Sequence, residues 1–151
     1  MLPTTKLDLF AGIPVTSYPD ARKWYDRLLG SPPAFLPHDT EAVWELATHR
    51  YVYVVQLRKH AGHARLTLFV DDLDSLVAGI GKRGIKATMR EAYPNGVRKI
   101  TYRDPDGNEI AFGGAAKRRT RRGSLSGSEA RASVRTSRPK GRIPRQRRGA
   151  K

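Results

Sequence analysis

The sequence predicts an α+β fold of two tandem βαβββ modules that form an open, barrel-like curved mixed sheet, followed by a disordered basic tail. Three observations lead to this prediction. The order strand, helix, three strands occurs twice within residues 1–116. All 12 aromatic residues (2 Trp, 6 Tyr and 4 Phe) precede residue 117. The tail, residues 117–151, carries 14 Lys and Arg against one acidic residue, whereas the first 116 residues carry 15 against 13.

The first module spans about residues 6–58. Apolar residues alternate with others from Leu7 to Val15, which predicts a strand with one buried face. Ser17 is the expected N-cap of the following helix, and Pro19 fits its first turn. Apolar residues at helical spacing form one stripe on this helix: Ala21, Trp24, Tyr25, Leu28 and Leu29. Gly30 ends the helix, and short strands are expected near residues 34–36, 42–47 and 51–58.

The second module spans about residues 64–114 and repeats this order. Alternation over residues 64–70 predicts its first strand, and Asp71 or Asp72 is the expected cap of the next helix, which Gly84 closes. Asn-Gly and Asp-Gly readily supply the positive φ angles of tight turns. Strands are therefore expected near residues 86–90 and 98–103 and through Ile110 and Phe112, separated by turns at Asn95-Gly96 and at residues 104–108.

One separation relates the two modules. Val15 and Val70 end equivalent first strands and are 55 residues apart. Leu57 and Phe112, taken as the ends of the two last strands, are also 55 residues apart. A constant offset at both ends of the unit indicates an internal repeat.

The tail has no apolar periodicity and is rich in Arg, Lys, Ser, Gly and Pro. Such a segment buries too little apolar surface to offset the entropy of ordering it, so we expect disorder. Its arginines could neutralise nucleic-acid phosphates without sequence specificity. The candidate contacts are Arg118, Arg119, Arg121, Arg122, Arg145, Arg147 and Arg148. The alternative is a solvated extension with no selected role.

The composition excludes several classes of protein. There is no cysteine, so disulfides, cysteine–zinc sites and thiol nucleophiles are excluded. No apolar run approaches the roughly 18 residues of a membrane span, and the start of the chain does not have the pattern of a secretory signal. We expect a soluble cytoplasmic protein without membrane association.

Five short stretches share an order that is typical of one superfamily. They are Ile13-Pro14-Val15-Thr16-Ser17, Ala21-Arg22-Lys23-Trp24-Tyr25, Leu28-Leu29-Gly30, Val70-Asp71-Asp72-Leu73-Asp74 and Tyr102-Arg103-Asp104-Pro105-Asp106-Gly107-Asn108. Over about residues 6–114 the chain resembles the vicinal oxygen chelate superfamily, which comprises glyoxalases, bleomycin-resistance proteins and extradiol dioxygenases. The resemblance implies that each module curls into half of an open barrel whose concave face holds the site. In enzymatic members, His or Gln and Glu from the first and last strands of both modules bind a divalent metal there.

The 55-residue separation matches those four positions to Phe10, Gln56, Arg65 and Ala111. Phe and Ala have no donor atom, and Arg is cationic. Gln56 alone does not make a metal site. The metal-dependent reactions of the family need the ion as a Lewis acid. We therefore expect no metal cofactor and favour a protein that is not an enzyme.

Without a metal, the fold implied by the resemblance still has a concave pocket. Its walls are aromatic and aliphatic with a few polar groups, as is typical of ligand sites. Its expected lining is Phe10, Val52, Val54, Gln56, Arg65, Thr67, Phe69 and Ala111. Arg65 needs a partner in such a place. That partner is either Asp8 or Glu109, in an internal ion pair, or an anionic or carbonyl-bearing ligand.

Three functional hypotheses follow. The favoured one is a metal-independent homodimer that binds an unidentified small molecule, as the antibiotic-sequestering members of the family do. The second is a glyoxalase- or dioxygenase-type enzyme with a non-standard site. The third is a nucleic-acid-associated protein that acts through its tail.

Other features are interpreted as structural. Residues 79–84 match G-x-G-x-x-G, but they end a predicted helix, whereas the dinucleotide motif opens one. His60 and His63 lie in the loop between modules without a nearby acidic cluster, which favours a solvated loop. Trp24 lies on the apolar helix stripe and is expected in the core. The alternation around Trp44 leaves open which face of its strand is buried.

Overall fold

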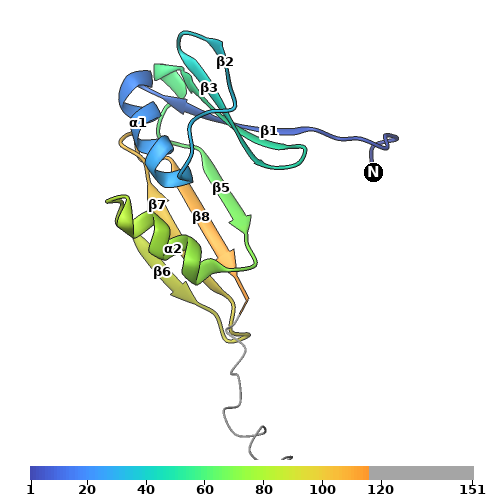
Figure 1. Ribbon diagram of the computed structural model, residues 1–151, viewed down its shortest axis with the longest axis vertical. Coiled ribbons are helices and arrows are strands. Elements are labelled where there is room, and N and C mark those ends of the chain that lie inside the picture. Colours follow the sequence, from blue (N-terminus) through green and yellow to red (C-terminus); the bar gives the residue numbers. More distant parts are fainter. Residues whose placement is uncertain (116–151) are drawn as a thin grey trace, which may run out of the picture. The chain divides into compact units, whose positions relative to one another are not determined.

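The computed structural model describes residues 1–115, whose path Figure 1 shows. The elements follow in the order β1 (Leu9–Val15), α1 (Tyr18–Leu29), β2 (Phe35–His38), β3 (Glu41–Ala47), β4 (Arg50–Gln56), η1 (Arg58–His60), β5 (Arg65–Phe69), α2 (Leu73–Lys82), β6 (Met89–Ala92), β7 (Arg98–Arg103) and β8 (Glu109–Gly114). The predicted order of strand, helix and three strands is therefore confirmed in both halves.

Each module forms its own four-stranded mixed sheet, and neither sheet closes into a barrel. The strand order is β1-β4-β3-β2 in the first sheet and β5-β8-β7-β6 in the second. In both sheets the first strand runs parallel to the last one. The other neighbours are antiparallel. The shared topology confirms the internal repeat.

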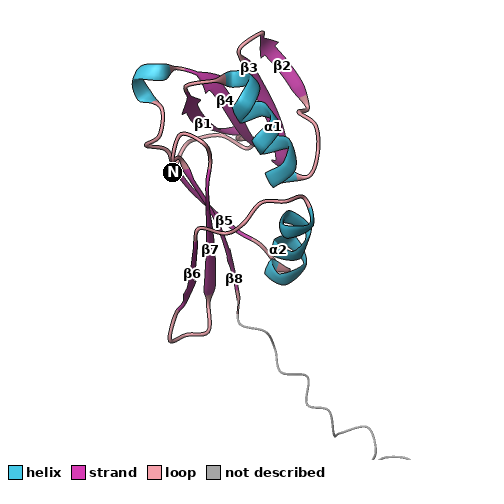
Figure 2. Cartoon of the chain, turned by 90° about the vertical axis from the view of Figure 1, so that its left-hand side faces the viewer, coloured by secondary structure: helices cyan, strands magenta, loops and turns pink. Residues whose placement is uncertain are grey.

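Both helices pack on the same side of the strands, as Figure 2 shows. The side chains beneath them form one hydrophobic cluster that draws on both modules and includes Ile13, Tyr25, Trp44, Leu73 and Phe112. Trp44 therefore faces this core, and its indole Nε1 donates to the carbonyl of Ser31 at 3.1 Å. Trp24 also belongs to the core, as predicted.

The two helices begin differently. Asp72 caps α2 as expected, because its Oδ1 accepts from the Ser75 N–H at 3.1 Å. Ser17 occupies the N-cap of α1 but makes no side-chain capping bond. Instead, Oε1 of Gln56 accepts from the Tyr18 N–H at 3.0 Å. A strand residue thus supplies the acceptor that the first turn of α1 needs.

The turn between β7 and β8 ties the modules together. Asp104 accepts from the Tyr25 hydroxyl at 2.8 Å and from the Asn108 side-chain amide at 2.8 Å. Asn108 is fully buried, and it also donates to the Pro14 carbonyl and accepts from the Ala64 N–H, both at 2.9 Å. Burial and the negative charge of Asp104 raise the pKa of Tyr25 well above its usual value, so the phenol keeps the proton that it donates.

Some strand boundaries differ from the predicted ones. β1 begins at Leu9, and both Leu7 and Leu9 are 58% exposed rather than part of the buried face. The apolar alternation of the sequence therefore begins before the part of β1 that packs against the core. β6 begins at Met89 instead of residue 86. In the described part of the chain, no helix is long and apolar enough to cross a membrane.

Candidate functional site

The predicted pocket residues do not share one surface. Phe10 lies on the open face of the first sheet, where its ring stacks on Tyr51 at 4.5 Å between centroids. Arg65, Thr67 and Ala111 line a small depression of about 30 Å³ on the open face of the second sheet. Phe69 has the same strand parity as Arg65 and Thr67 and is also exposed.

The expected positions of Val52, Val54 and Gln56 are wrong. Val52 and Val54 are 2% and 0% exposed and belong to the core beneath α1. Gln56 has the same strand parity and turns toward the start of α1. Their side chains therefore point away from the open face that carries Phe10.

A three-residue slip explains the error. Ile13 pairs with Val54 in the first sheet, and its counterpart Leu68 pairs with Phe112 in the second. The last strands are thus related by 58 residues (112 − 54), not 55. The extra residues lie in the second hairpin, where β6 and β7 are joined by residues 93–97, whereas β2 and β3 are joined by two residues. An odd shift reverses the face of every side chain on a strand.

The corrected register places Tyr53, not Gln56, in the position equivalent to Ala111. Tyr53 lies across from Gly12 on the open face, where a Cβ on Gly12 would come within 2.5 Å of the phenol oxygen. The four positions that the resemblance implies therefore become Phe10, Tyr53, Arg65 and Ala111. This donor set does not fit the divalent-metal site of the family, because it contains no carboxylate or imidazole. Among residues 1–115, no cluster of three or more His, Cys, Asp or Glu could hold a metal ion.

The open face of the first sheet is aromatic. The rings of Phe10 and Tyr51 are nearly parallel, with an interplanar angle of 12°. Phe35 meets Tyr51 edge-on at 6.5 Å. Burial, followed by the charges of nearby acidic groups, raises the pKa of Tyr51. These rings give the first sheet an apolar surface that the helices do not cover.

The open face of the second sheet is charged. Arg65 forms an ion pair with Glu109 at 3.0 Å, which is one of the two partners expected for it. Arg103 binds the other carboxylate oxygen of Glu109 at 2.9 Å. The hydrogen bond from Arg103 is the largest cause that holds the pKa of Glu109 below its usual range. Lys99 pairs with Glu91 at 2.9 Å and likewise lowers the pKa of that carboxyl. The carboxylate of Glu109 is thus shared by two guanidinium groups, whereas that of Glu91 pairs with one ammonium group.

A larger space lies between the modules. It is a cavity of about 560 Å³, within the range of roughly 300–1,000 Å³ that is typical of small-molecule sites. The two helices and both sheets contribute apolar walls. These are Leu28, Leu29, Trp44, Leu46, Leu68, Val70, Leu76 and Phe112. Of the predicted pocket residues, Thr67 and Phe69 line this cavity.

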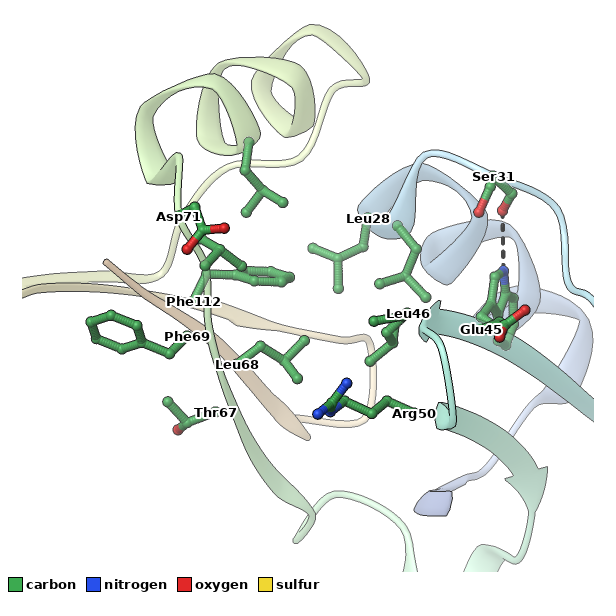
Figure 3. A pocket seen from close by; sticks show the side chains of 15 residues that line it. Leu28, Ser31, Glu45, Leu46, Arg50, Thr67, Leu68, Phe69, Asp71 and Phe112 are labelled. Carbon is green, nitrogen blue, oxygen red and sulfur yellow. Dashed lines mark hydrogen bonds between the residues drawn. The ribbon is translucent and has the colours of Figure 1, made fainter. Parts of the chain in front are cut away.

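A few polar groups lie at the edge of the cavity. Figure 3 shows the Arg50 side chain reaching into the space from the start of β4, and Asp71 on the side of α2. Glu45 lies near Ser31 at the far end. Arg50 was not among the predicted pocket residues, because a single Arg after a turn has no distinguishing sequence pattern. The aliphatic alternation of Val52 and Val54 could have indicated the correct buried face of β4.

The glycine-rich motif and the two loop histidines have the structural roles that were predicted for them. Gly79 and Gly81 lie within the second half of α2, so residues 79–84 do not open a helix. His60 and His63 are exposed beside η1. The expected disorder of residues 117–151 and the nucleic-acid contacts proposed from Arg118 to Arg148 lie outside the described residues.

Comparisons with known proteins give a consistent result. Residues 6–112 match the family described as the Glyoxalase/Bleomycin resistance protein/Dioxygenase superfamily. The crystal structure of a glyoxalase / bleomycin resistance protein from Catenulispora acidiphila DSM 44928 is 53% identical, with a TM-score of 0.72, and the match covers 73% of this chain and 99% of that one. No curated protein matches the chain.

Two more distant structures show the same fold. TnmS3, an antibiotic binding protein from Streptomyces sp. CB03234, is 22% identical with a TM-score of 0.58, and the match covers 77% of this chain and 100% of that one. Lactoylglutathione lyase from Agrobacterium tumefaciens is 16% identical with a TM-score of 0.58, and the match covers 74% and 95%. The fold is thus shared by a binding protein and an enzyme.

Proposed function

Because the chain belongs to the Glyoxalase/Bleomycin resistance protein/Dioxygenase superfamily, we propose that it is a member that binds a small organic molecule without using a metal ion. The observation that carries the proposal is the donor-poor set Phe10, Tyr53, Arg65 and Ala111 at the four strand positions. Lewis-acid chemistry requires a held ion, and these side chains offer one phenol and one cation.

The cavity between the modules supports binding. Its volume suits a small organic molecule, and its walls are mostly aliphatic and aromatic with a few polar groups at the edge. Such walls favour an apolar ligand, because its removal from water is the main source of affinity. The antibiotic-binding activity in the name of TnmS3 is a precedent for this fold, and a comparable role here is part of the proposal.

The exposed aromatic face of the first sheet supports a second element of the proposal, that the protein is a homodimer. Phe35 and Leu36 are neighbours on β2 and are both exposed, but alternate strand residues point to opposite faces. Phe35 contacts Tyr51 on the open face. If a second copy covers that face, Phe35→Lys gives a monomer and Leu36→Lys leaves a dimer. Sedimentation of the full chain measures this, and a wild-type monomer contradicts the dimer.

Calorimetry of the full chain with Zn, Ni, Mn, Fe(II) and Co tests metal independence. We expect no stoichiometric tight binding. A variant with His60→Ala and His63→Ala is the control, because these exposed imidazoles are the most readily available weak ligands outside the sheets. Tight binding that survives this double replacement would contradict metal independence, and the enzyme hypothesis would then replace the proposal.

A neutral fluorophore tests ligand binding. N-phenylnaphthylamine is apolar and brightens when it leaves water, so we expect saturable binding to the full chain. Leu46 lies on the same face of β3 as Trp44 and lines the cavity, so Leu46→Trp places a large side chain in this space and should abolish binding. Leu57→Trp is the matched control, because it makes the same replacement at a leucine that does not line the cavity. No saturable binding, or equal loss in both variants, contradicts the cavity as the ligand site.

A further inference from the structure

Among residues 1–115, Arg50 is the only cation that lines the cavity between the modules. It begins β4, directly after His49, whose φ of 64° turns the chain into the strand. This turn directs the side chain into the space between Leu46 and Thr67, as Figure 3 shows. Its position therefore follows from the backbone of the β3–β4 hairpin.

Within the described residues, Arg50 has no carboxylate partner. Its one hydrogen bond there runs from Nη1 to the Thr48 carbonyl at 3.3 Å. By contrast, Arg65, Arg98 and Arg103 each bind a carboxylate at 3.0 Å or less. A guanidinium offers five donors in a fixed fork, so most of the donors of Arg50 are free to bind a ligand.

The two acids beside the cavity have other stabilising neighbours. Glu45 lies across from Tyr51 in the first sheet, and its charge contributes to the raised pKa of that phenol. Asp71 immediately precedes Asp72, the N-cap of α2, where the helix dipole favours negative charge. Figure 3 shows Asp71 and Arg50 on opposite sides of the space. A negatively charged group of a ligand would therefore bind on the Arg50 side of the cavity, away from Asp71.

We propose that the cavity takes an organic anion with an apolar body, whose carboxylate or sulfonate binds Arg50 while the body lies against Leu28, Leu68 and Phe112. Arg pairs planar carboxylates with two parallel hydrogen bonds, and such pairs are stronger when water is excluded by apolar walls. This inference rests on the proposed function and specifies the class of ligand.

Two matched fluorophores test it. Anilinonaphthalene sulfonate has the same ring system as N-phenylnaphthylamine and adds one negative charge. In the full chain, Arg50→Gln should weaken binding of the sulfonate about 10-fold, the effect of losing one charge-assisted contact, and leave the neutral compound within about two-fold. Arg50→Lys should lie between these limits, because it keeps the charge and loses the fork.

Arg58→Gln is the control for net charge. Arg58 is exposed in η1 and does not line the cavity, and all variants carry the same basic tail. The inference is overturned if Arg50→Gln leaves sulfonate binding unchanged, or if Arg58→Gln weakens it equally. If the neutral fluorophore binds in either case, the proposed function survives. If neither fluorophore binds wild type, the proposed function itself fails.

Discussion

Replacement of Asn108 tests the polar clamp between the modules. Asn108→Ala removes three hydrogen bonds: a buried one to the Asp104 carboxylate, and two partly buried ones, to the Pro14 carbonyl and from the Ala64 N–H. A neutral bond contributes about 1 kcal/mol, and a bond to a charged group about 1.5–3 kcal/mol. The three bonds together therefore predict a loss of about 4 kcal/mol in the free energy of unfolding. That is a large share of the roughly 5–15 kcal/mol of a typical domain.

Asn95→Ala is the matched control. Asn95 makes one exposed bond, in which its Oδ1 accepts from the Val97 N–H at 3.1 Å, so its replacement should cost less than about 1 kcal/mol. Urea unfolding monitored by Trp24 and Trp44 fluorescence gives both values. If Asn108→Ala does not fold, Tyr25→Phe provides the measurement, with an expected loss of about 2 kcal/mol for its single bond to Asp104. Losses equal to that of Asn95→Ala in both variants would refute the clamp.

Three further outcomes are expected. Arg83 donates to the last carbonyls of α1, so Arg83→Ala should lower the free energy of unfolding by about 1–2 kcal/mol in urea; an unchanged value contradicts this contact. By NMR titration, Arg103→Gln should raise the pKa of Glu109 more than Arg65→Gln does, since the Arg103 bond is the largest cause of its lowering, and the reverse order contradicts the assignment. Stability from this lowered pKa is present above the unfolded-state value and is lost as the pH falls through the folded-state value. The full chain should retard duplex DNA in electrophoresis, with an affinity that falls at least about 10-fold between about 50 and 200 mM salt; retardation that persists without residues 117–151 would exclude the tail as its cause.

The fold could be predicted because its signals are local. Strand alternation, the apolar stripe of α1 and the turn residues each depend on a few neighbouring positions. Gly30, Gly96 and Gly107 all have the positive φ angles that their turns were expected to need. The ends of β1 and β6 were less predictable, because a strand ends where its partner ends, and the partner is distant in sequence.

The site was harder to predict because it depends on which strand face is buried. Residues 51–54 alternate tyrosine with valine, and both types favour strands and suit a buried face. The sequence pattern therefore predicted the strand. Which of its faces is buried was inferred only from the 55-residue offset between the modules. Arg50 was missed for a different reason. Its role in the proposal comes from the absence of a carboxylate partner among residues 1–115, and no local sequence pattern indicates that.

The slip between the modules also changes the argument about metal binding. Equivalent positions in two repeated modules keep a constant separation only up to the first insertion, which here is the longer β6–β7 loop. Up to α2 the 55-residue offset holds, so Phe10 and Arg65 are equivalent. Beyond the loop the offset is 58, and Tyr53 replaces Gln56 as the counterpart of Ala111. The uncorrected set contained one amide oxygen that could contribute to a site, whereas Gln56 in fact accepts from the first turn of α1. The correction therefore strengthens the case for metal-independent binding, and it directs attention from the open sheet faces to the cavity that Arg50 enters.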